Sequence, residues 1–566
     1  MAIVGIDLGT TYSLVGVFRD GAPSLVENVL GARLTPSVVG LDDDGQVLVG
    51  QAAKERLITH PALTAATFKR FMGTDRTTRL GSRSFRPEEL SSFVLRSLKA
   101  DAEALLGAPV EEAVISVPAY FGDAQRKATR TAGEMAGLRV ERLINEPTAA
   151  AMAYGLHEAR DETTFLVFDL GGGTFDVSVV EIFEGVVEVH ASAGDSFLGG
   201  EDFTAALVAG FLERAQIAEA ALDAGERSRL WKQAELAKQR LTLAEAAEIV
   251  LTLQGREIAW PVGRGELERR TQELAERMRR PVERAMRDAQ LRVADLDDVV
   301  LVGGATRMPL VRALVARLFG RFPLASVHPD EAVALGTAIQ AGLKARDKAL
   351  AEVVLTDTSP HSLGVAVAIP NERGEPVGLE FSPIIERNTV IPASREQSYS
   401  PTHAQQREVQ FEIYQGESRR LENNVKLGSL TLPLAPGNAR EQQLLVRFTY
   451  DINGLLEVDT SVAGTQLRRS LVIEGNPGFL TREEIAKRIA QLQELKVHPR
   501  ERMENRTVLA RGERIFEESL GERRLLVSSL LSRFDAVLAR QDAREIAKAR
   551  EELAAALDEL EQGPSW

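Results

Sequence analysis

Residues Phe165 to Val180 read FLVFDLGGGTFDVSVV, and this stretch decides the fold. An apolar run ends at Asp169, three glycines follow, and a second apolar run begins after Thr174, which predicts a strand, a glycine turn and another strand. Glycines leave room for backbone N–H groups to close around an anion, and an aspartate with a threonine suits a phosphate accompanied by Mg²⁺. Taken alone, the stretch fits a hairpin without a ligand equally well.

A second stretch near the N-terminus repeats this pattern. Residues Ile3 to Val17 read IVGIDLGTTYSLVGV, with the segment Asp7–Gly9 between two apolar runs. A third glycine pair, Gly303-Gly304, follows the apolar run 298–302 and precedes Arg307. The two Asp-Leu-Gly copies predict a duplicated α/β domain in which two phosphate loops face each other.

Composition narrows the class of protein. The 566 residues are enough for three or four domains, and a hydrophobic fraction of 44% is ample for buried cores. The net charge of −14 argues against nucleic acid and anionic membranes as partners, and the absence of cysteine excludes disulfides and thiol chemistry. Without a membrane-length apolar run or room for a signal peptide, the sequence predicts a soluble, cytoplasmic protein.

Two segments of the first half carry candidate catalytic groups. The dipeptide Lys69-Arg70 is either a surface basic pair or the source of a cation for a phosphate. Glu146 precedes Pro147, which predicts that Glu146 stays outside the helix that Pro147 begins. Glu146 would then lie at a strand-to-helix turn, where open α/β sheets bind ligands. A carboxylate favoured only by a helix N-terminus is the alternative.

A third segment carries a polar face. The helix predicted over 227–242 places Glu235, Lys238 and Thr242 on one side. This face is either a solvated ion pair or a wall for a base or ribose.

The pattern changes in the second half. Alternating residues from Asp357 to about Glu474, with the hairpin signal Asn453-Gly454, predict a β-sandwich. Residues 481–562 are charged, helical and nearly free of glycine and proline, which predicts a small helical bundle. The apolar segment in Lys348–Asp357 is either an edge strand or a linker that docks in one state and is released in another.

Several motifs together make the chain resemble the 70-kDa heat-shock-protein chaperone family of the DnaK type, and also its shorter HscC-like bacterial branch. The motifs are GIDLGTTYS (5–13), VPAYFGDAQR (117–126), INEPTAAAMAYG (144–155), FDLGGGTFDVS (168–178), LGGEDF (198–203), LVGGATRMP (301–309), HPDEAVALGTA (328–338), SLG (362–364), NTVIP (388–392) and YQGE (414–417).

The resemblance implies an actin-like ATPase domain over 1–347, an interdomain linker over 348–357, a β-sandwich substrate-binding domain over 358–476 and an α-helical lid over 477–566. It implies a stress-response chaperone that binds and releases extended apolar segments of unfolded proteins, with ATP hydrolysis allosterically coupled to client affinity. ATP/ADP and Mg²⁺ are the implied cofactors, with K⁺ as an optional ion. Implied partners are client polypeptides, a J-domain co-chaperone and, optionally, a nucleotide-exchange factor.

The resemblance also assigns residue roles. Asp7 and Asp169 would hold hydrated Mg²⁺, and Lys69, Glu146 and Thr174 would complete the catalytic set. The implied nucleotide contacts are Gly9, Thr10, Thr11, Tyr12, Gly171, Gly172, Gly173, Thr174, Gly199, Gly200, Glu235, Lys238, Thr242, Gly303, Gly304, Arg307 and Asp330. The implied allosteric residues are Pro118, Arg126, Arg142, Asn145, Val354, Leu355 and Asp357.

In the client groove, Ala368 and Thr402 would form an arch over the peptide, with Val409 and Phe411 on the floor. The pattern at Val409 and Phe411 fits sandwich core equally well. An alanine gives less apolar cover than the methionine usual in the family, which predicts weak client binding.

The chain departs from the family pattern in several places. The segment after Gly73 is short and the region 241–262 is compact, which puts the usual exchange factor in question. The peptide-binding half carries an extra loop, Pro370–Val377. A sugar-kinase-like phosphotransferase and a non-hydrolysing nucleotide-binding scaffold are the alternatives. The linker, sandwich and lid argue against a kinase, and Lys69 with Glu146 and Thr174 argues against a scaffold.

Overall fold

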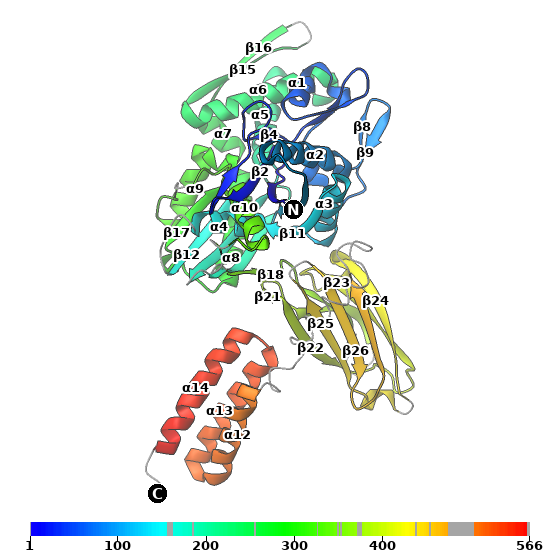
Figure 1. The fold of residues 1–566 in the computed structure, drawn as a ribbon, viewed down its shortest axis with the longest axis vertical. Helices are drawn as coiled ribbons and strands as arrows, with labels where there is room; N and C mark the ends of the chain where they lie inside the picture. The colour runs from blue at the N-terminus through cyan, green and yellow to red at the C-terminus, as the bar shows by residue number, and fades with distance from the viewer. Residues whose placement is uncertain are drawn as a thin grey trace.

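The computed structural model describes residues 2–155, 162–183, 186–253, 256–324, 327–347, 350, 354–370, 376–435, 438–451, 454–473 and 503–562. Figure 1 shows three parts: a mixed α/β body that holds the N-terminus, a unit of β-strands beside it, and a helical bundle near the C-terminus. The predicted turn residue Asn453 and the predicted lid residues 477–502 lie outside the described residues.

Two glycine hairpins organise the α/β body. Strands β1 (Ala2–Asp7) and β2 (Tyr12–Arg19) pair antiparallel in one sheet. Strands β12 (Glu162–Leu170) and β13 (Phe175–Phe183) pair in the same way in a second sheet. The predicted strand–turn–strand units are confirmed at both sites.

The two sheets repeat one further feature. The first strand of each hairpin has a parallel neighbour, β10 (Val110–Val117) beside β1 and β17 (Asp298–Val302) beside β12. This repeat confirms the duplicated α/β architecture. We call residues 2–145 the first lobe and residues 162–324 the second lobe. The other strands of the two sheets are β3 (Ala22–Leu25), β4 (Thr35–Pro36), β11 (Arg139–Asn145), β14 (Val186–Asp195), β18 (Val354–Thr358) and β21 (Val390–Ile391).

Two helices of small residues lie between the sheets. Helices α4 (Glu146–Gly155) and α10 (Ala332–Lys344) share a buried cluster with strands of both sheets. A Cβ on Gly336 would lie 1.7 Å from the Ala149 carbonyl oxygen, so this crossing requires glycine. The prediction that Glu146 stays outside the helix is wrong, because Glu146 is the first residue of α4. The bias against helix before proline is outweighed here, because a helix N-terminus needs no N–H bond from Pro147 and favours a carboxylate.

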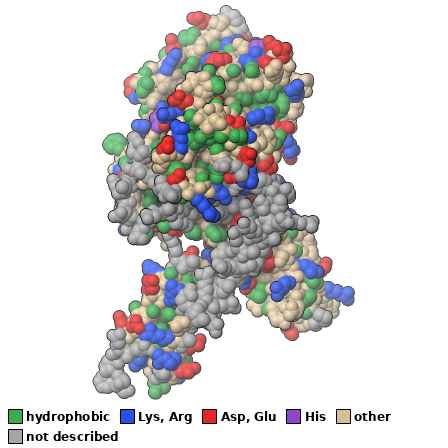
Figure 2. All heavy atoms as spheres, viewed as in Figure 1, with side chains coloured by type: hydrophobic (Ala, Val, Ile, Leu, Met, Phe, Trp, Pro, Cys, Tyr) green, Lys and Arg blue, Asp and Glu red, His purple; other side chains and the backbone are tan. Residues whose placement is uncertain are grey.

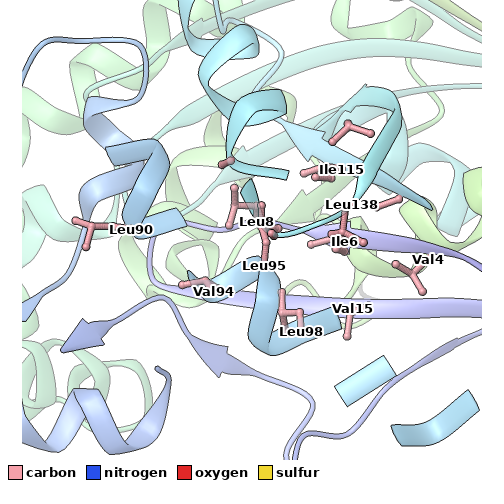
Figure 3. Close-up of a cluster of buried hydrophobic side chains, with 14 of the residues drawn as sticks. Val4, Ile6, Leu8, Val15, Leu90, Val94, Leu95, Leu98, Ile115 and Leu138 are labelled. Carbon is pink, nitrogen blue, oxygen red and sulfur yellow. The ribbon is translucent and has the colours of Figure 1, made fainter. Parts of the chain in front are cut away.

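The outer face of the first sheet is covered by helices α2 (Pro87–Leu106) and α3 (Asp123–Met135). Their apolar residues recur at helical spacing and face β1, β2 and β10. Figure 3 shows this packing for Val4, Ile6, Leu8, Val15, Leu90, Val94, Leu95, Leu98, Ile115 and Leu138.

Smaller elements complete both lobes. The first lobe adds α1 (Gln51–Thr59), β5 (Val39–Leu41), β6 (Val47–Val49), η1 (Pro61–Leu63), β7 (Thr64–Ala65), η2 (Phe68–Phe71), β8 (Thr78–Leu80) and β9 (Arg83–Phe85). The second lobe adds α5 (Gly200–Ala215), η3 (Glu219–Ala221), α6 (Ala224–Leu243), β15 (Ala246–Leu253), β16 (Arg256–Gly263), α7 (Arg264–Arg270), α8 (Gln272–Asp288), η4 (Val293–Asp295), η5 (Gly304–Arg307) and α9 (Pro309–Phe319).

Two four-stranded antiparallel sheets form the β unit. One sheet contains β20 (Pro376–Ile385), β19 (Leu363–Pro370), β23 (Glu408–Gln415) and β24 (Val425–Pro433). The other contains β22 (Ala393–Tyr399), β25 (Leu444–Tyr450), β26 (Leu456–Val462) and β27 (Arg468–Ile473). Residues of both sheets form one buried cluster, which confirms the predicted β-sandwich. The predicted loop Pro370–Val377 joins β19 to β20, and its residues 371–375 lie outside the described residues.

Of the segment Lys348–Asp357, predicted as edge strand or linker, residues 354–357 belong to strand β18, whereas residues 348, 349 and 351–353 lie outside the described residues. β18 pairs parallel with β14 of the second lobe and antiparallel with β21, which leads into the sandwich. The C-terminal bundle contains α12 (Met503–Glu518), α13 (Gly521–Arg540) and α14 (Ala543–Gln562) around a shared apolar core, as predicted for these residues.

The surface of the molecule mixes both charge signs. Figure 2 shows acidic and basic side chains interspersed over the visible face of the α/β body. No helix in the described part of the chain has the length and apolar character needed to cross a membrane.

Candidate functional site

A cavity of about 490 Å³ lies between the two glycine hairpins and is lined from both lobes. The predicted site residues that line it are Asp7, Gly9, Thr10, Thr11, Tyr12, Lys69, Glu146, Asp169, Gly171, Gly172, Thr174, Gly200, Glu235, Lys238, Thr242, Gly303, Gly304, Arg307 and Asp330. Gly173 and Gly199 are not among the lining residues. A Cβ on Gly199 would lie 2.4 Å from the Gly173 nitrogen, so these two glycines pack backbone against backbone.

Sequence reasoning missed part of this lining. The missed residues are Leu14, Leu34, Glu201, Gln239, Leu243, Val302, Ala305, Met308, Pro329 and Val333. Glu201 and Gln239 directly follow the predicted residues Gly200 and Lys238, so their proximity was an available signal. The apolar members carry no such signal, because strands and cores use the same residue types.

The tips of the two hairpins meet at the cavity. A Cβ on Gly172 would lie 2.0 Å from Thr11 Oγ1, and a Cβ on Gly9 would lie 2.0 Å from the Tyr12 carbonyl oxygen. The two tips can therefore approach only because Gly172 lacks a side chain, whereas Gly9 allows the first turn itself to be tight. Exposed backbone N–H groups in such turns form a concave site for an anion.

One buried lysine enters the cavity. Lys69 lies on η2, is 3% exposed, and places Nζ 2.6 Å from Glu146 Oε1. This buried position excludes the interpretation of Lys69 as part of a solvated basic pair on the surface. A buried ion pair of this kind is weak evidence for stability, because burying two charges costs much of what their attraction returns.

Three buried aspartates surround this ion pair. Burial raises the pKa of Asp7, Asp169 and Asp176 above the ordinary range, and the Glu146 carboxylate raises each pKa further. Lys69 opposes this effect at all three aspartates. Asp7 and Asp169 line the cavity together with Glu146 and Lys69, whereas Asp176 does not line it. The carboxylates there outnumber the lysine, and a bound cation would relieve this imbalance.

Two of the aspartates are oriented by hydrogen bonds. Ser116 Oγ donates to Asp7 Oδ1 at 2.8 Å, and the Tyr120 backbone N–H donates to Asp176 Oδ1 at 3.0 Å. Within the described ranges, no cluster of three or more histidine, cysteine or acidic side chains has the arrangement of a direct metal site. Asp7 and Asp169 line the same cavity, and carboxylate oxygens are ligands that suit a hydrated Mg²⁺ ion.

Helix α6 supplies a polar wall at the other end of the cavity. Lys238 Nζ lies 2.6 Å from Glu235 Oε2 and donates to the Gly200 carbonyl at 2.8 Å. Both side chains line the cavity together with Thr242, so the shared face is turned toward the cavity. Arg307 forms an ion pair with Asp330 on the opposite side.

A chain of hydrogen bonds connects the first lobe to the segment that leads into the sandwich. Arg126 donates to Asn145 Oδ1 at 2.5 Å, and Asn145 Nδ2 donates to Asp357 Oδ1 at 2.7 Å. The positive charge of Arg142 also faces Asp357, although burial lowers the pKa of Arg142. Pro118, the remaining predicted allosteric side chain described here, is buried at the end of β10. The structure thus brings Arg126, Asn145 and Asp357 together.

Sequence reasoning missed a second set of contacts at this junction. Arg387 of the sandwich binds both carboxylate oxygens of Asp288 at 2.9 Å and also contacts Glu417 at 2.8 Å. Gln415 Oε1 accepts from the Asp123 backbone N–H at 3.1 Å. These contacts hold the sandwich against both lobes.

The predicted groove residues lie on the sandwich. Ala368 is opposite Leu379 on the neighbouring strand, and Thr402 donates to Gln406 in a loop. Phe411 is 4% exposed within the sandwich core, and Val409 packs against the same cluster. Phe411 and Val409 therefore fit both interpretations, because a side chain of the sandwich core can also lie beneath a peptide-binding groove.

The comparisons with known proteins agree along the chain. A family model described as Hsp70 protein matches residues 3–80 and 76–562. A relative named chaperone protein DnaK 1, from Synechococcus sp., is 39% identical over 609 residues, covering 99% of this chain and 80% of the relative. A relative named chaperone protein DnaK, from Thermotoga maritima, is 41% identical over 493 residues, covering 84% of this chain and 80% of the relative. The chain belongs to the Hsp70 family.

Proposed function

We propose that this chain hydrolyses ATP in the cavity between its lobes and uses the change of nucleotide to control client binding by the sandwich. Membership of the Hsp70 family supports both the ATPase and the chaperone functions. One observation of the structure carries the coupling. Glu146, which pairs with Lys69 in the cavity, directly follows Asn145, which binds Asp357 at the sandwich junction.

The proposed division of the chain follows the sequence boundaries: ATPase domain 1–347, linker 348–357, substrate-binding domain 358–476 and lid 477–566. In this scheme the backbone of both glycine turns binds the phosphates, and Glu235, Lys238, Thr242 and Arg307 hold the nucleoside. Asp7 and Asp169 would hold a hydrated Mg²⁺ ion, which would supply positive charge against the phosphates when bound. Lys69 meets the γ-phosphate, while Glu146 and Thr174 orient the attacking water, so catalysis rests on positioning and electrostatics.

The proposed partners are extended apolar segments of unfolded proteins and a J-domain co-chaperone. The proposed location is the cytoplasm, with K⁺ and an exchange factor as optional additions. The client arch would be formed by Ala368 and Thr402. Pro118, Arg126, Arg142, Asn145, Val354, Leu355 and Asp357 would transmit the state of the nucleotide.

A steady-state ATPase assay with and without an unfolded apolar peptide tests this function. We expect slow basal hydrolysis that the peptide accelerates, and release of labelled peptide that ATP accelerates. Conversion of ATP to ADP that requires a sugar and yields a sugar phosphate would identify a phosphotransferase. Tight nucleotide binding with no turnover would identify a scaffold.

The junction also predicts a pH dependence of docking between the sandwich and the lobes. The His361 ring packs on Tyr120 with 4.8 Å between centroids, and Arg126, Arg284 and Glu417 are the charged groups that face it. The pKa of His361 is lowered from 6.5 to about 4, chiefly by burial and also by the two arginines, against opposing effects of Glu417 and of a hydrogen bond with the Tyr120 backbone.

Because the docked pKa lies below that of a free histidine, protons bind the undocked state preferentially. Docking is therefore fully stable above pH 6.5 and weakens as the pH falls toward about 4. We expect roughly a tenfold loss between about pH 7 and about pH 5 with ATP bound. Dyes on two engineered cysteines, one in each part, report docking without background because the chain has none. A His361→Leu variant should lose this dependence, and an unchanged pH profile in that variant would exclude His361.

A further inference from the structure

We propose that Arg70 and Asp202 form a bridge between the lobes that sets the rate of nucleotide release, and this inference rests on the proposed ATPase function. Arg70 Nη2 lies 3.0 and 3.2 Å from the two carboxylate oxygens of Asp202. Arg70 belongs to η2 in the first lobe, and Asp202 belongs to the first turn of α5 in the second lobe. The contact therefore joins the two lobes that line the cavity, and these lobes must separate before a nucleotide can leave it.

The bridge is built into the phosphate-binding turns. A Cβ on Gly173 would lie 2.7 Å from Arg70 Cγ, so the arginine stem lies directly against the glycine turn of the second lobe. Asp202 Oδ2 also accepts from the Gly199 backbone N–H at 2.8 Å, which fixes the carboxylate at the start of α5. Both partners are thus positioned before they meet, which reduces the entropy lost when the bridge closes.

Burial makes the Arg70–Asp202 bridge stronger than a more exposed ion pair between the same two lobes. The side chains of Arg70 and Asp202 are 15% and 24% exposed. A second interlobe pair, Lys232 with Glu55, is separated by 3.7 Å and is 50% and 63% exposed. Water and salt screen the second pair much more effectively, so the Arg70–Asp202 bridge contributes more to holding the lobes together.

The bridge also bears on the catalytic lysine. Arg70 follows Lys69 on the same short helix, so attaching Arg70 to the second lobe restrains the position of Lys69 relative to Gly172 and Gly173. Arg70 and Asp202 do not line the cavity. They act as positioning residues rather than catalytic residues.

Stopped-flow release of a fluorescent ADP analogue tests the bridge. We expect Arg70→Gln and Asp202→Asn each to accelerate release roughly tenfold, because opening of the lobes limits departure of the nucleotide. The KM for ATP should rise accordingly, while the single-turnover hydrolysis rate should change less. The asparagine keeps an acceptor for the Gly199 N–H, so the start of α5 is preserved.

A variant with both substitutions tests whether Arg70 and Asp202 act as a pair or affect nucleotide release independently. If the residues act as a pair, Arg70→Gln combined with Asp202→Asn should release ADP about as fast as either single variant. Additive effects would overturn the bridge. Asp43→Asn is the matched control, because it removes the partner of Arg56 at 2.9 Å within the first lobe, and it should leave release unchanged.

Failure of the bridge and failure of the proposed function give different results. If the parent protein binds neither ADP nor ATP, the ATPase proposal is wrong. If the parent binds nucleotide and all variants release it at the parental rate, the ATPase proposal stands and the bridge is wrong. An unchanged thermal midpoint in the variants shows that faster release does not come from unfolding.

Discussion

Lys69→Ala should bind ATP and hydrolyse it about a hundredfold to a thousandfold more slowly than the parent protein. Lys69 is the cation paired with Glu146, and it opposes the raised pKa of Asp7, Asp169 and Asp176. In the proposed site, alanine removes the positive charge that would face the phosphate, and preorganised charges of this kind typically contribute a few kcal/mol to the transition state. The two glycine turns remain, so we expect ATP binding to persist.

Single-turnover hydrolysis and nucleotide affinity on the purified variant measure these two effects separately. Lys99→Ala is the matched control, because Lys99 of the same lobe donates to the Gly137 carbonyl away from the cavity. Hydrolysis near the parental rate in Lys69→Ala would remove this residue from the mechanism. Loss of nucleotide binding would show that Lys69 serves affinity instead.

Asp357→Ala should abolish the acceleration of client release by ATP, although ATP and client each still bind. Asp357 is 6% exposed, accepts from Asn145, and faces the positive charge of Arg142. Removing the carboxylate leaves the buried Asn145 amide without this acceptor, which destabilises the docked arrangement by about 2–3 kcal/mol. That figure corresponds to a shift of the docking equilibrium of roughly thirtyfold to a hundredfold.

Release of a labelled apolar peptide, with and without ATP, tests this prediction. The parent should release peptide faster with ATP, whereas the variant should release it at one rate under both conditions. Asp459→Ala is the control, because Asp459 pairs with Ser470 inside the sandwich sheet. Normal acceleration by ATP in Asp357→Ala would show that this junction does not carry the coupling.

Much of the cavity was predictable because its residues follow local rules. Asp7 ends β1 and Asp169 is the second-last residue of β12, and in both cases a glycine turn begins two residues later. Their spacing therefore reports the geometry of each hairpin without any tertiary information. Glu235, Lys238 and Thr242 could be grouped because helical periodicity alone places them on one face.

Contacts between segments that are far apart in the chain could not be predicted from the sequence. Arg70 and Asp202 are 132 positions apart, and Ser116 lies 109 positions from Asp7. Such pairs have no spacing rule, since they depend on how the two lobes and their sheets are assembled. Glu146 shows a different limit, because the local bias before proline was outweighed by the helix N-terminus that the tertiary fold places there.

The adjacency of Asn145 and Glu146 has a consequence for how movement passes through the molecule. Consecutive Cα atoms joined by a trans peptide stay about 3.8 Å apart, and the peptide plane between them is stiff. Asn145 binds Asp357, Glu146 binds Lys69, and no flexible loop separates these two residues. A displacement of one of them is therefore passed directly to the other. One stiff peptide unit therefore joins the residue that pairs with Lys69 in the cavity to the residue that binds Asp357 at the sandwich junction.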